Sequence, residues 1–255
     1  MKPRGLVTTV LVGLMFIGAD LIQRTVVVVI IKLRPSARER ILTSWLRGLS
    51  DIAQWVFERI GGANMEILPK IPALPGTLIL MNHQSLLDIP IAVRCFDGGY
   101  PKIVARDRYR TGLPLISHMI RLYGHPTVRP GEGDAEQLRS LREMASEVAQ
   151  PLVIYPEGSR SRDGGIRPFR TGGLKAILGA REWSVYVVVL DGLWQSTSVG
   201  GFIRNVSSMR IRVDSVGPFA FDGADGADAF IDSMERHMRT KLEEIRQVDK
   251  TTADS

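Results

Sequence analysis

The chain has 255 residues, of which 44% are hydrophobic and 24% charged, so it can bury one substantial core with an appendage. Its single cysteine, Cys95, excludes an intrachain disulfide, and the formal net charge of +6 indicates an anionic partner, either nucleic acid or an anionic membrane. The sequence contains no zinc-ligand spacing, Walker loop or RNP motif, so we expect membrane lipid and not nucleic acid as that partner.

The first predicted element is an apolar segment near the N-terminus. Residues 5–19 carry no charge, a few polar residues between 20 and 24 interrupt the pattern, and 26–31 resume it. Residues 5–19 are shorter than the ~20 residues that a membrane-spanning helix needs, whereas 5–31 suffice for one tilted span. Basic residues flank both ends, so the charge pattern gives no orientation. Two interpretations remain: a single span, or a re-entrant or interfacial anchor with both ends on the cytoplasmic face.

A helix is predicted over residues 36–60, because apolar side chains recur there every three or four positions. Such a stripe either lies on a bilayer or packs on a core, and packing is the commoner outcome. Gly61 and Gly62 end the helix. The predicted organisation is therefore an N-terminal membrane-anchoring helical region (1–60), an α/β domain (61–247) and a polar C-terminal tail (248–255).

The most informative stretch begins with a predicted strand. The run Thr77–Met81 has the length and apolar character of a buried strand, and Asn82 and His83 follow it directly. In α/β folds, residues that follow the carboxyl ends of strands form the sites. We therefore expect His83 to lie at such an edge.

Asp88 lies five residues after His83, in an apolar segment, 86–93, that can begin a helix. If the chain turns between them, the carboxylate can orient the imidazole and stabilise its charged form, as a general base requires. The alternative is purely structural, because Ser85-x-x-Asp88 also matches a helix capping box.

A second predicted strand, 151–155, runs into the polar loop Pro156-Glu157-Gly158-Ser159-Arg160-Ser161-Arg162. The loop and its continuation carry four arginines, at positions 160, 162, 167 and 170. Guanidinium groups bind phosphate through two parallel hydrogen bonds. This cluster therefore suits a phosphate, and the alternative is a solvated basic loop.

The remaining predicted elements alternate between strands and helices. The strands are 101–105, 185–190 and 209–213, and the helices are 113–122, a helix through 138–148 with Asp134 and Gln137 as its capping box, 169–180 and 227–247. This alternation predicts an α/β domain with helices covering a mostly parallel sheet.

The ordered pair of motifs, Asn82-His83-x4-Asp88 and then Pro156 to Arg162, resembles the glycerolipid acyltransferases of the 1-acylglycerol-3-phosphate acyltransferase (PlsC-like) superfamily over residues 60–220. The resemblance implies that His83 is the catalytic base and that Asp88 orients it. It also implies a phosphate site for the acceptor, formed by Glu157, Gly158, Ser159 and Arg160.

Two further family blocks match less closely. A Gly-strand-Arg block resembles Gly124–Arg129, which adds Arg129 as a second phosphate ligand, although the last family Arg aligns one position later at Pro130. The late family block contains a proline, whereas the corresponding residues 185–192 contain none. This departure leaves the identity of the acceptor open.

The resemblance implies an O-acyltransferase at the cytoplasmic face of the inner or plasma membrane. It would move a fatty acyl group from acyl-CoA or acyl-ACP to 1-acyl-sn-glycerol-3-phosphate, giving phosphatidic acid. We expect no metal, no bound cofactor and no covalent acyl-enzyme, since Gly-x-Ser-x-Gly is absent. Backbone N–H groups near the start of the helix after His83 are the candidate oxyanion donors.

Other functions stay open at this point. Within the enzyme class, the acceptor could instead be glycerol 3-phosphate, a lyso-ornithine lipid or a lysophospholipid that is being remodelled. A lipid thioesterase or hydrolase, and a non-catalytic basic membrane-binding module, are the alternatives from other classes.

Overall fold

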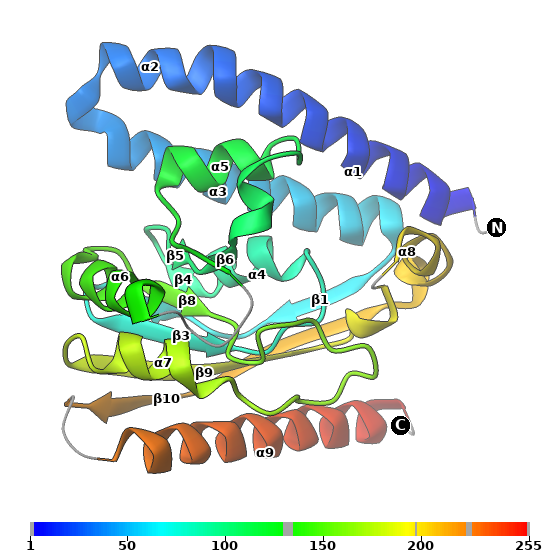
Figure 1. Cartoon of the computed structure of the whole chain (residues 1–255). Helices are drawn as coiled ribbons and strands as arrows, with labels where there is room; N and C mark the ends of the chain where they lie inside the picture. The colour runs from blue at the N-terminus through cyan, green and yellow to red at the C-terminus, as the bar shows by residue number, and fades with distance from the viewer. Residues whose placement is uncertain (1–2, 130–134, 197, 223–225, 254–255) are drawn as a thin grey trace.

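A six-stranded sheet runs through the centre of the computed structural model, which describes residues 3–129, 135–196, 198–222 and 226–253 (Figure 1). The strand order is β1-β10-β9-β3-β8-β5. The strands are β1 (Asn64–Ile67), β10 (Arg210–Phe221), β9 (Trp183–Asp191), β3 (Thr77–Met81), β8 (Leu152–Ile154) and β5 (Lys102–Ile103). All neighbouring pairs are parallel except β9 and β10, which confirms the predicted mostly parallel sheet.

Two small parallel sheets complete the strand inventory of the described residues. Their members are β2 (Ile71–Pro72) with β4 (Phe96–Asp97), and β6 (Ala105–Arg106) with β7 (Thr127–Val128). The predicted strand 101–105 is therefore split between β5, which pairs with β8, and β6, which pairs with β7.

Strand β3 lies inside the sheet and is buried on both faces. Leu78 and Leu80 contribute to one hydrophobic cluster, and Ile79 and Met81 to the other. Successive side chains of a strand point to opposite faces, so a run of consecutive apolar residues is what a doubly covered strand requires. All residues of β3 are buried, as the apolar run predicts.

Helices cover both faces of the sheet (Figure 1). One face packs against α6 (Ala135–Glu147), α7 (Thr171–Leu178) and α9 (Ala227–Ala253), and the other packs against α3 (Arg38–Trp55), α4 (Asp88–Arg94) and α8 (Val199–Asn205). The other helical elements are α1 (Pro3–Ile22), α2 (Val28–Leu33), α5 (Ile116–Tyr123), the π-helical turns η1 (Gln23–Val27) and η3 (Val56–Gly61), and the short 3-10 turns η2 (Pro35–Ala37), η4 (Asp107–Arg110), η5 (Trp194–Ser196) and η6 (Val206–Ser208).

The N-terminal segment forms one long helical stretch, and α3 then returns beneath it (Figure 1). Of the described helices, Pro3–Leu33 alone is long and apolar enough to cross a membrane by length and composition. The stretch nevertheless touches the rest of the chain closely. A Cβ atom on Gly5 would lie 1.8 Å from the carbonyl oxygen of Ile203, so only glycine permits this approach of α1 to α8.

The predicted helix over 36–60 packs on the core. Leu42, Leu46 and Ala53 of α3 are buried, and Gly62 caps the end of η3 with a positive φ of 80°. Ala53 and Phe57 belong to the same hydrophobic cluster as Ile79, so the helical region and the sheet share one core.

Two elements, β10 and α9, extend several residues beyond their predicted ends. Strand β10 continues past Val213 to Phe221, because it keeps pairing with β9 across a register shift between Val216 and Phe219. Helix α9 continues past Gln247 to Ala253, where the sequence predicted the start of a polar tail. The predicted cap at Asp134 lies outside the described residues.

Candidate active site

The two sequence motifs meet at one edge of the sheet. Strands β3 and β8 are parallel neighbours, with Leu80 opposite Ile154, so their carboxyl ends lie side by side. The turn after β3 carries His83, and the loop of residues 156–170 after β8, here named the arginine loop, carries the predicted phosphate ligands. A parallel sheet thereby brings together residues that are far apart in sequence.

His83 and Asp88 form a hydrogen-bonded pair. The distance from His83 Nδ1 to Asp88 Oδ2 is 2.7 Å, the Asp88 side chain is fully buried, and the His83 side chain is 20% exposed. A carboxylate only accepts hydrogen bonds, so Nδ1 carries the proton in this pair. Nε2 is then the free acceptor nitrogen, as a general base requires.

Asp88 also organises the turn that presents His83. Its carboxylate accepts the N–H of Gln84 at 2.7 Å and that of Ser85 at 2.9 Å. The bond from Ser85 N–H is one half of a capping box. The other half is absent from the described contacts, because the hydroxyl of Ser85 accepts the N–H of Leu87 and α4 begins only at Asp88. The two interpretations of Asp88 are therefore not exclusive.

Glu157 links the two motifs through hydrogen bonds to their backbones. It is 2% exposed, and its oxygens accept the backbone N–H groups of His83 and Arg167, each at 2.8 Å. The carbonyl of His83 in turn accepts the N–H of Ser161 at 2.7 Å. Burial raises the pKa of Glu157, whereas the backbone N–H groups of Arg167 and His83 lower it. The structure thus places this predicted substrate ligand as a residue that holds the backbone of the site.

Buried amides fix the same turn to strand β9. The side chain of Asn82 both donates to the carbonyl of Leu190 and accepts its N–H, each at 2.8 Å. Gln84 is fully buried and accepts the N–H groups of Leu193 and Trp194 at 2.9 and 3.1 Å. The sequence showed these residues as part of a polar turn, but their partners lie more than 100 residues away and carry no local signal.

Tyr155, the last residue of the predicted strand 151–155, also belongs to the site. Its ring stacks on the His83 imidazole with a centroid distance of 4.3 Å and an interplanar angle of 28°. Its hydroxyl is buried without a hydrogen-bond partner among the described residues. Burial raises the pKa of Tyr155 well above its usual range, so the ring stays neutral beside His83.

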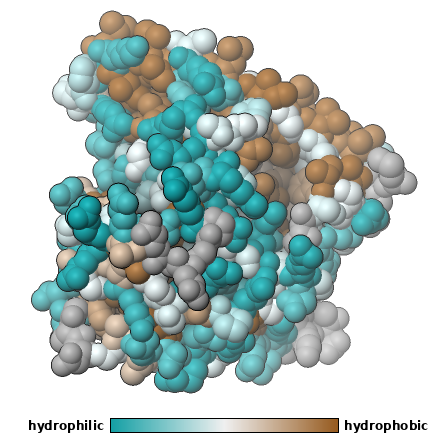
Figure 2. Space-filling model, viewed as in Figure 1, coloured by the Kyte–Doolittle hydropathy of each residue, from teal (hydrophilic) through white to brown (hydrophobic). Residues whose placement is uncertain are grey.

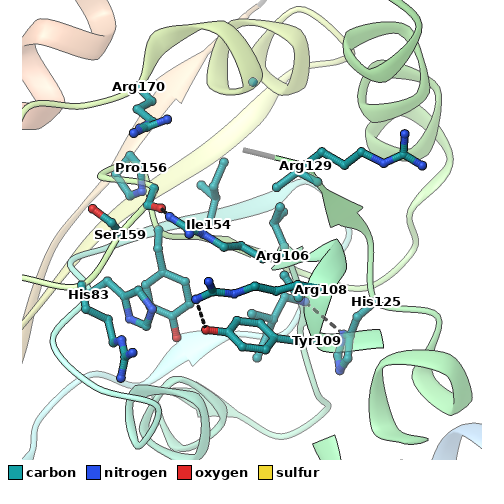
Figure 3. Close-up of a pocket in the computed structure, with 18 of the residues that line it drawn as sticks. His83, Arg106, Arg108, Tyr109, His125, Arg129, Ile154, Pro156, Ser159 and Arg170 are labelled. Atoms are coloured by element: carbon teal, nitrogen blue, oxygen red, sulfur yellow. Dashed lines mark hydrogen bonds between the residues drawn. The ribbon is translucent and has the colours of Figure 1, made fainter. Parts of the chain in front are cut away.

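A cavity of about 1160 Å³ opens in front of His83 (Figure 3). Its basic lining comprises Arg106, Arg108, Arg129, Arg160, Arg162, Arg167 and Arg170. Its apolar lining includes Leu86, Ile89, Ile103, Leu113, Ile116, Met119, Ile120, Val128, Leu138, Leu141 and Leu174. The cavity therefore offers both a strongly basic region and a large apolar one.

The predicted phosphate ligands occupy different parts of this cavity. Gly158, Ser159, Arg160 and Arg129 all line it, and the side chain of Arg129 is 85% exposed. Arg106 donates a hydrogen bond to the carbonyl of Gly158 and so braces the arginine loop. In Figure 3 the side chains of Arg106 and Arg108 extend across the cavity toward the wall that carries His83.

Two other histidines, His125 at the cavity and His118 on α5, have structural partners. His125 Nδ1 accepts the N–H of Ile103 at 3.1 Å, and burial lowers the pKa of His125 to about 3. His118 Nδ1 lies 2.8 Å from the amide nitrogen of Gln23, and burial lowers its pKa as well. Of the described histidines, His83 is the one held by a carboxylate at the cavity.

Comparison with known proteins assigns this arrangement to a family. The Acyltransferase family model matches residues 63–191, which is half of the chain and includes both motifs. The chain therefore belongs to the Acyltransferase family, and the resemblance drawn from the motifs is confirmed.

Two similar proteins are consistent with this assignment. A 1-acyl-sn-glycerol-3-phosphate acyltransferase from Cocos nucifera is 27% identical over 128 residues, a match that covers 48% of this chain and 40% of that protein. The chain thus spans less than half the length of that relative. The crystal structure of PlsC, the 1-acyl-sn-glycerophosphate (LPA) acyltransferase from Thermotoga maritima, has a TM-score of 0.70 and 18% identity, covering 96% of this chain and 97% of that chain. That likeness shows a shared fold.

Replacement of Asp88 separates orientation of His83 from helix capping. In Asp88→Asn an amide N–H can face Nδ1, so the imidazole loses both its tautomer and its counter-ion. We expect turnover per folded molecule to fall by at least about 100-fold, the lower end for loss of general-base catalysis. The variant should also be less stable by on the order of 1–3 kcal/mol, because buried N–H groups lose an acceptor. Turnover and the thermal midpoint, Tm, measure the two effects.

Ser85→Ala is the matched control, because it removes the hydroxyl that accepts Leu87 N–H and leaves the carboxylate in place. This variant should lose roughly 0.5–2 kcal/mol of stability, as is typical for loss of a helix cap, and its Tm should fall accordingly. Its turnover should be nearly unchanged. If Asp88→Asn instead turns over normally per folded molecule, Asp88 is only a structural cap.

Proposed function

We propose that this protein is an O-acyltransferase that moves a fatty acyl group from a thioester donor to the free hydroxyl of lysophosphatidic acid, giving phosphatidic acid. The observation that carries the proposal is the position of His83. It lies on the wall of one cavity that is lined by arginines and by aliphatic side chains. An acceptor with a phosphate and an acyl chain needs both kinds of lining.

The chemistry needs one proton carrier. His83 Nε2 takes the proton of the acceptor hydroxyl as its oxygen attacks the thioester carbonyl, and the new C–O bond forms. Asp88 stabilises the imidazolium that results. When the tetrahedral intermediate collapses, the C–S bond breaks and the imidazolium protonates the leaving thiolate. Protons balance within this cycle, so we propose no resident metal or cofactor.

The structure narrows the choice of oxyanion donors. The N–H groups of Gln84 and Ser85 bond to Asp88, and that of Leu87 bonds to Ser85. Between residues 84 and 88, the N–H of Leu86 has no partner among the described residues, and Leu86 lines the cavity. We propose this group as a donor to the developing oxyanion.

The basic lining supports an acceptor that carries phosphate. Arg160 lies in the arginine loop beside Gly158, whose positive φ of 65° turns the loop backbone. The relatives in Cocos nucifera and Thermotoga maritima are described as acting on lysophosphatidic acid, which is consistent with this acceptor. We propose acyl-CoA or acyl carrier protein as the donor, because both deliver an acyl group as a thioester.

We further propose that the segment of residues 3–33 is an interfacial membrane anchor. Along α1, Val7, Val10, Leu14, Ile17 and Leu21 are exposed at spacings of three and four, and they form one apolar stripe. Figure 2 shows hydrophobic residues gathered over this end of the molecule, while the remaining visible face is mostly hydrophilic. An exposed stripe of this kind lies in the interfacial region of a bilayer.

The opposite face of the segment favours this arrangement over a single span. Thr8 and Gln23 are fully buried, and Gln23 bonds to Trp45 of α3 at 3.0 Å and to His118 of α5 at 2.8 Å. A helix that contacts its own domain at both its start and its middle lies along the domain. Of the two interpretations left open by the sequence, these contacts therefore support the interfacial anchor.

The reaction is tested by incubating the purified protein in lipid vesicles with a labelled acyl donor and a panel of lyso-acceptors. Labelled product should require an acceptor and be largest with lysophosphatidic acid. Arg160→Ala should raise the KM for this acceptor by about tenfold or more, because a charged hydrogen bond is lost, and leave the donor KM unchanged. Arg236→Ala, an exposed arginine on α9, is the matched control and should have no effect.

Other outcomes select other functions. Release of free fatty acid irrespective of acceptor indicates a hydrolase, and the absence of any labelled product indicates a binding module. An unchanged acceptor KM in Arg160→Ala removes that residue from the phosphate site.

The anchor is tested by placing charges on the apolar stripe. Leu14→Glu combined with Ile17→Glu should release the protein from anionic vesicles, because buried apolar area supplies most of the binding. The control combines Ser140→Glu with Thr240→Glu, two exposed positions elsewhere that add the same charge. Sedimentation with vesicles measures both. If high salt alone releases the unmodified protein, the attachment is electrostatic and the proposed anchor is wrong.

A further inference from the structure

The C-terminal helix α9, which lies beyond the residues matched by the family model, holds the arginine loop at three points. Glu235 accepts the N–H of Phe169 at 2.9 Å, Arg239 donates to the carbonyl of Ile166 at 2.9 Å, and Arg246 donates to the carbonyl of Gly164 at 2.8 Å. These contacts reach backbone groups along the second half of the loop. They therefore constrain where its backbone lies, whatever its own side chains do.

Arg246 is also connected to the turn that carries His83, through Asp191 and Gln84. Its Nε and one terminal nitrogen bond to the two carboxylate oxygens of Asp191, at 2.7 and 3.1 Å. Asp191 ends β9 and accepts a hydrogen bond from the side chain of Gln84 at 3.2 Å. Gln84 is the residue after His83. One guanidinium therefore links the arginine loop to the turn that presents the catalytic base.

The arginine loop packs closely against Arg246 and Trp194 at Gly164. Gly164 has a positive φ of 78°, and a Cβ atom there would lie 2.7 Å from the Trp194 ring and 2.8 Å from an Arg246 nitrogen. Trp194 is held by Gln84 through its backbone N–H. The loop thus touches two groups that both depend on the His83 turn.

We propose that Arg246 is a positioning residue, which fixes the arginine loop relative to His83 and so sets the site for the acceptor phosphate. The planar guanidinium presents several donors in a rigid fork, so it can serve a carboxylate and a carbonyl at once. Hydrogen bonding to Asp191 raises the pKa of Arg246, so it stays charged in this role. The assignment to acceptor binding rests on the proposed function, whereas the control of loop position does not.

Fold stability depends little on this side chain. Helix α9 packs through buried Met234, Met238, Leu242 and Ile245, and the Arg246 side chain is 40% exposed. Partly exposed ion pairs contribute little to stability because solvent screens them. Removal of Arg246 should therefore loosen the loop without unfolding the helix.

The test compares Arg246→Ala, Arg246→Lys and the control Arg236→Ala in the full-length protein. Two measurements are made: backbone hydrogen exchange across peptides that cover 158–170, and the kinetic constants for lysophosphatidic acid and for the donor. Arg246→Ala should speed exchange in this loop and leave exchange in β3 and β9 unchanged. Its acceptor KM should rise by about tenfold, with kcat and donor KM nearly unchanged. Arg246→Lys should be intermediate, because an ammonium keeps the charge but loses the fork.

The outcomes separate this inference from the proposed function. Unchanged hydrogen exchange of the arginine loop in Arg246→Ala overturns the inference. A fall in kcat of about tenfold without any change in the acceptor KM overturns it as well. Faster loop exchange with an unchanged acceptor KM in both Arg246→Ala and Arg160→Ala supports the positioning role but removes the phosphate site. A changed KM in Arg160→Ala alone retains the phosphate site and overturns the role of Arg246 in acceptor binding.

Discussion

The buried carboxylate of Asp88 is the interaction on which the rest of the site depends. It has no solvent exposure, and it accepts hydrogen bonds from the His83 ring and from the backbone N–H groups of Gln84 and Ser85. A buried carboxylate without such partners is costly, so the turn must adopt the conformation that supplies them. The same conformation leaves His83 Nε2 as the free nitrogen at the cavity. The turn conformation that supplies partners to Asp88 is therefore also the one that presents His83 to the cavity.

Glu157 extends this constraint to the second motif. By accepting the N–H groups of His83 and Arg167, it fixes the base and the arginine loop to each other. Hydrogen bonds to charged groups contribute on the order of 1.5–3 kcal/mol each. Two of them therefore restrict the backbone of this loop. The arginines proposed to bind the acceptor phosphate can then lie in a loop whose backbone is still held at a defined distance from His83. This rigidity matters because a base must lie within hydrogen-bond reach of the hydroxyl.

Much of the fold could be predicted because its signals are local. The apolar run Thr77–Met81 and the polar turn after it define β3 and the position of His83, and spacings of three and four define α3 and α9. The pairing of His83 with Asp88 was also predictable, since five residues suffice for one turn. The roles of Glu157, Tyr155 and Arg246 were not, because each depends on a partner brought close by the sheet. The family motif implied that Glu157 shapes a phosphate site; in the structure Glu157 is buried and accepts the backbone N–H groups of His83 and Arg167. The backbone donors expected near the helix start were likewise mostly engaged by Asp88 and Ser85.

The most direct test of the account is the transfer rate of His83→Ala in vesicles, measured with labelled donor and lysophosphatidic acid. Transfer should fall by at least about 100-fold, because His83 is the one carboxylate-paired histidine among the described residues that line the cavity. Binding of the acceptor should persist, since the arginine loop is held by Glu157 and α9 and not by the His83 ring. A variant that binds the acceptor and still transfers the acyl group at nearly the unmodified rate would contradict the central claim that His83 is the base.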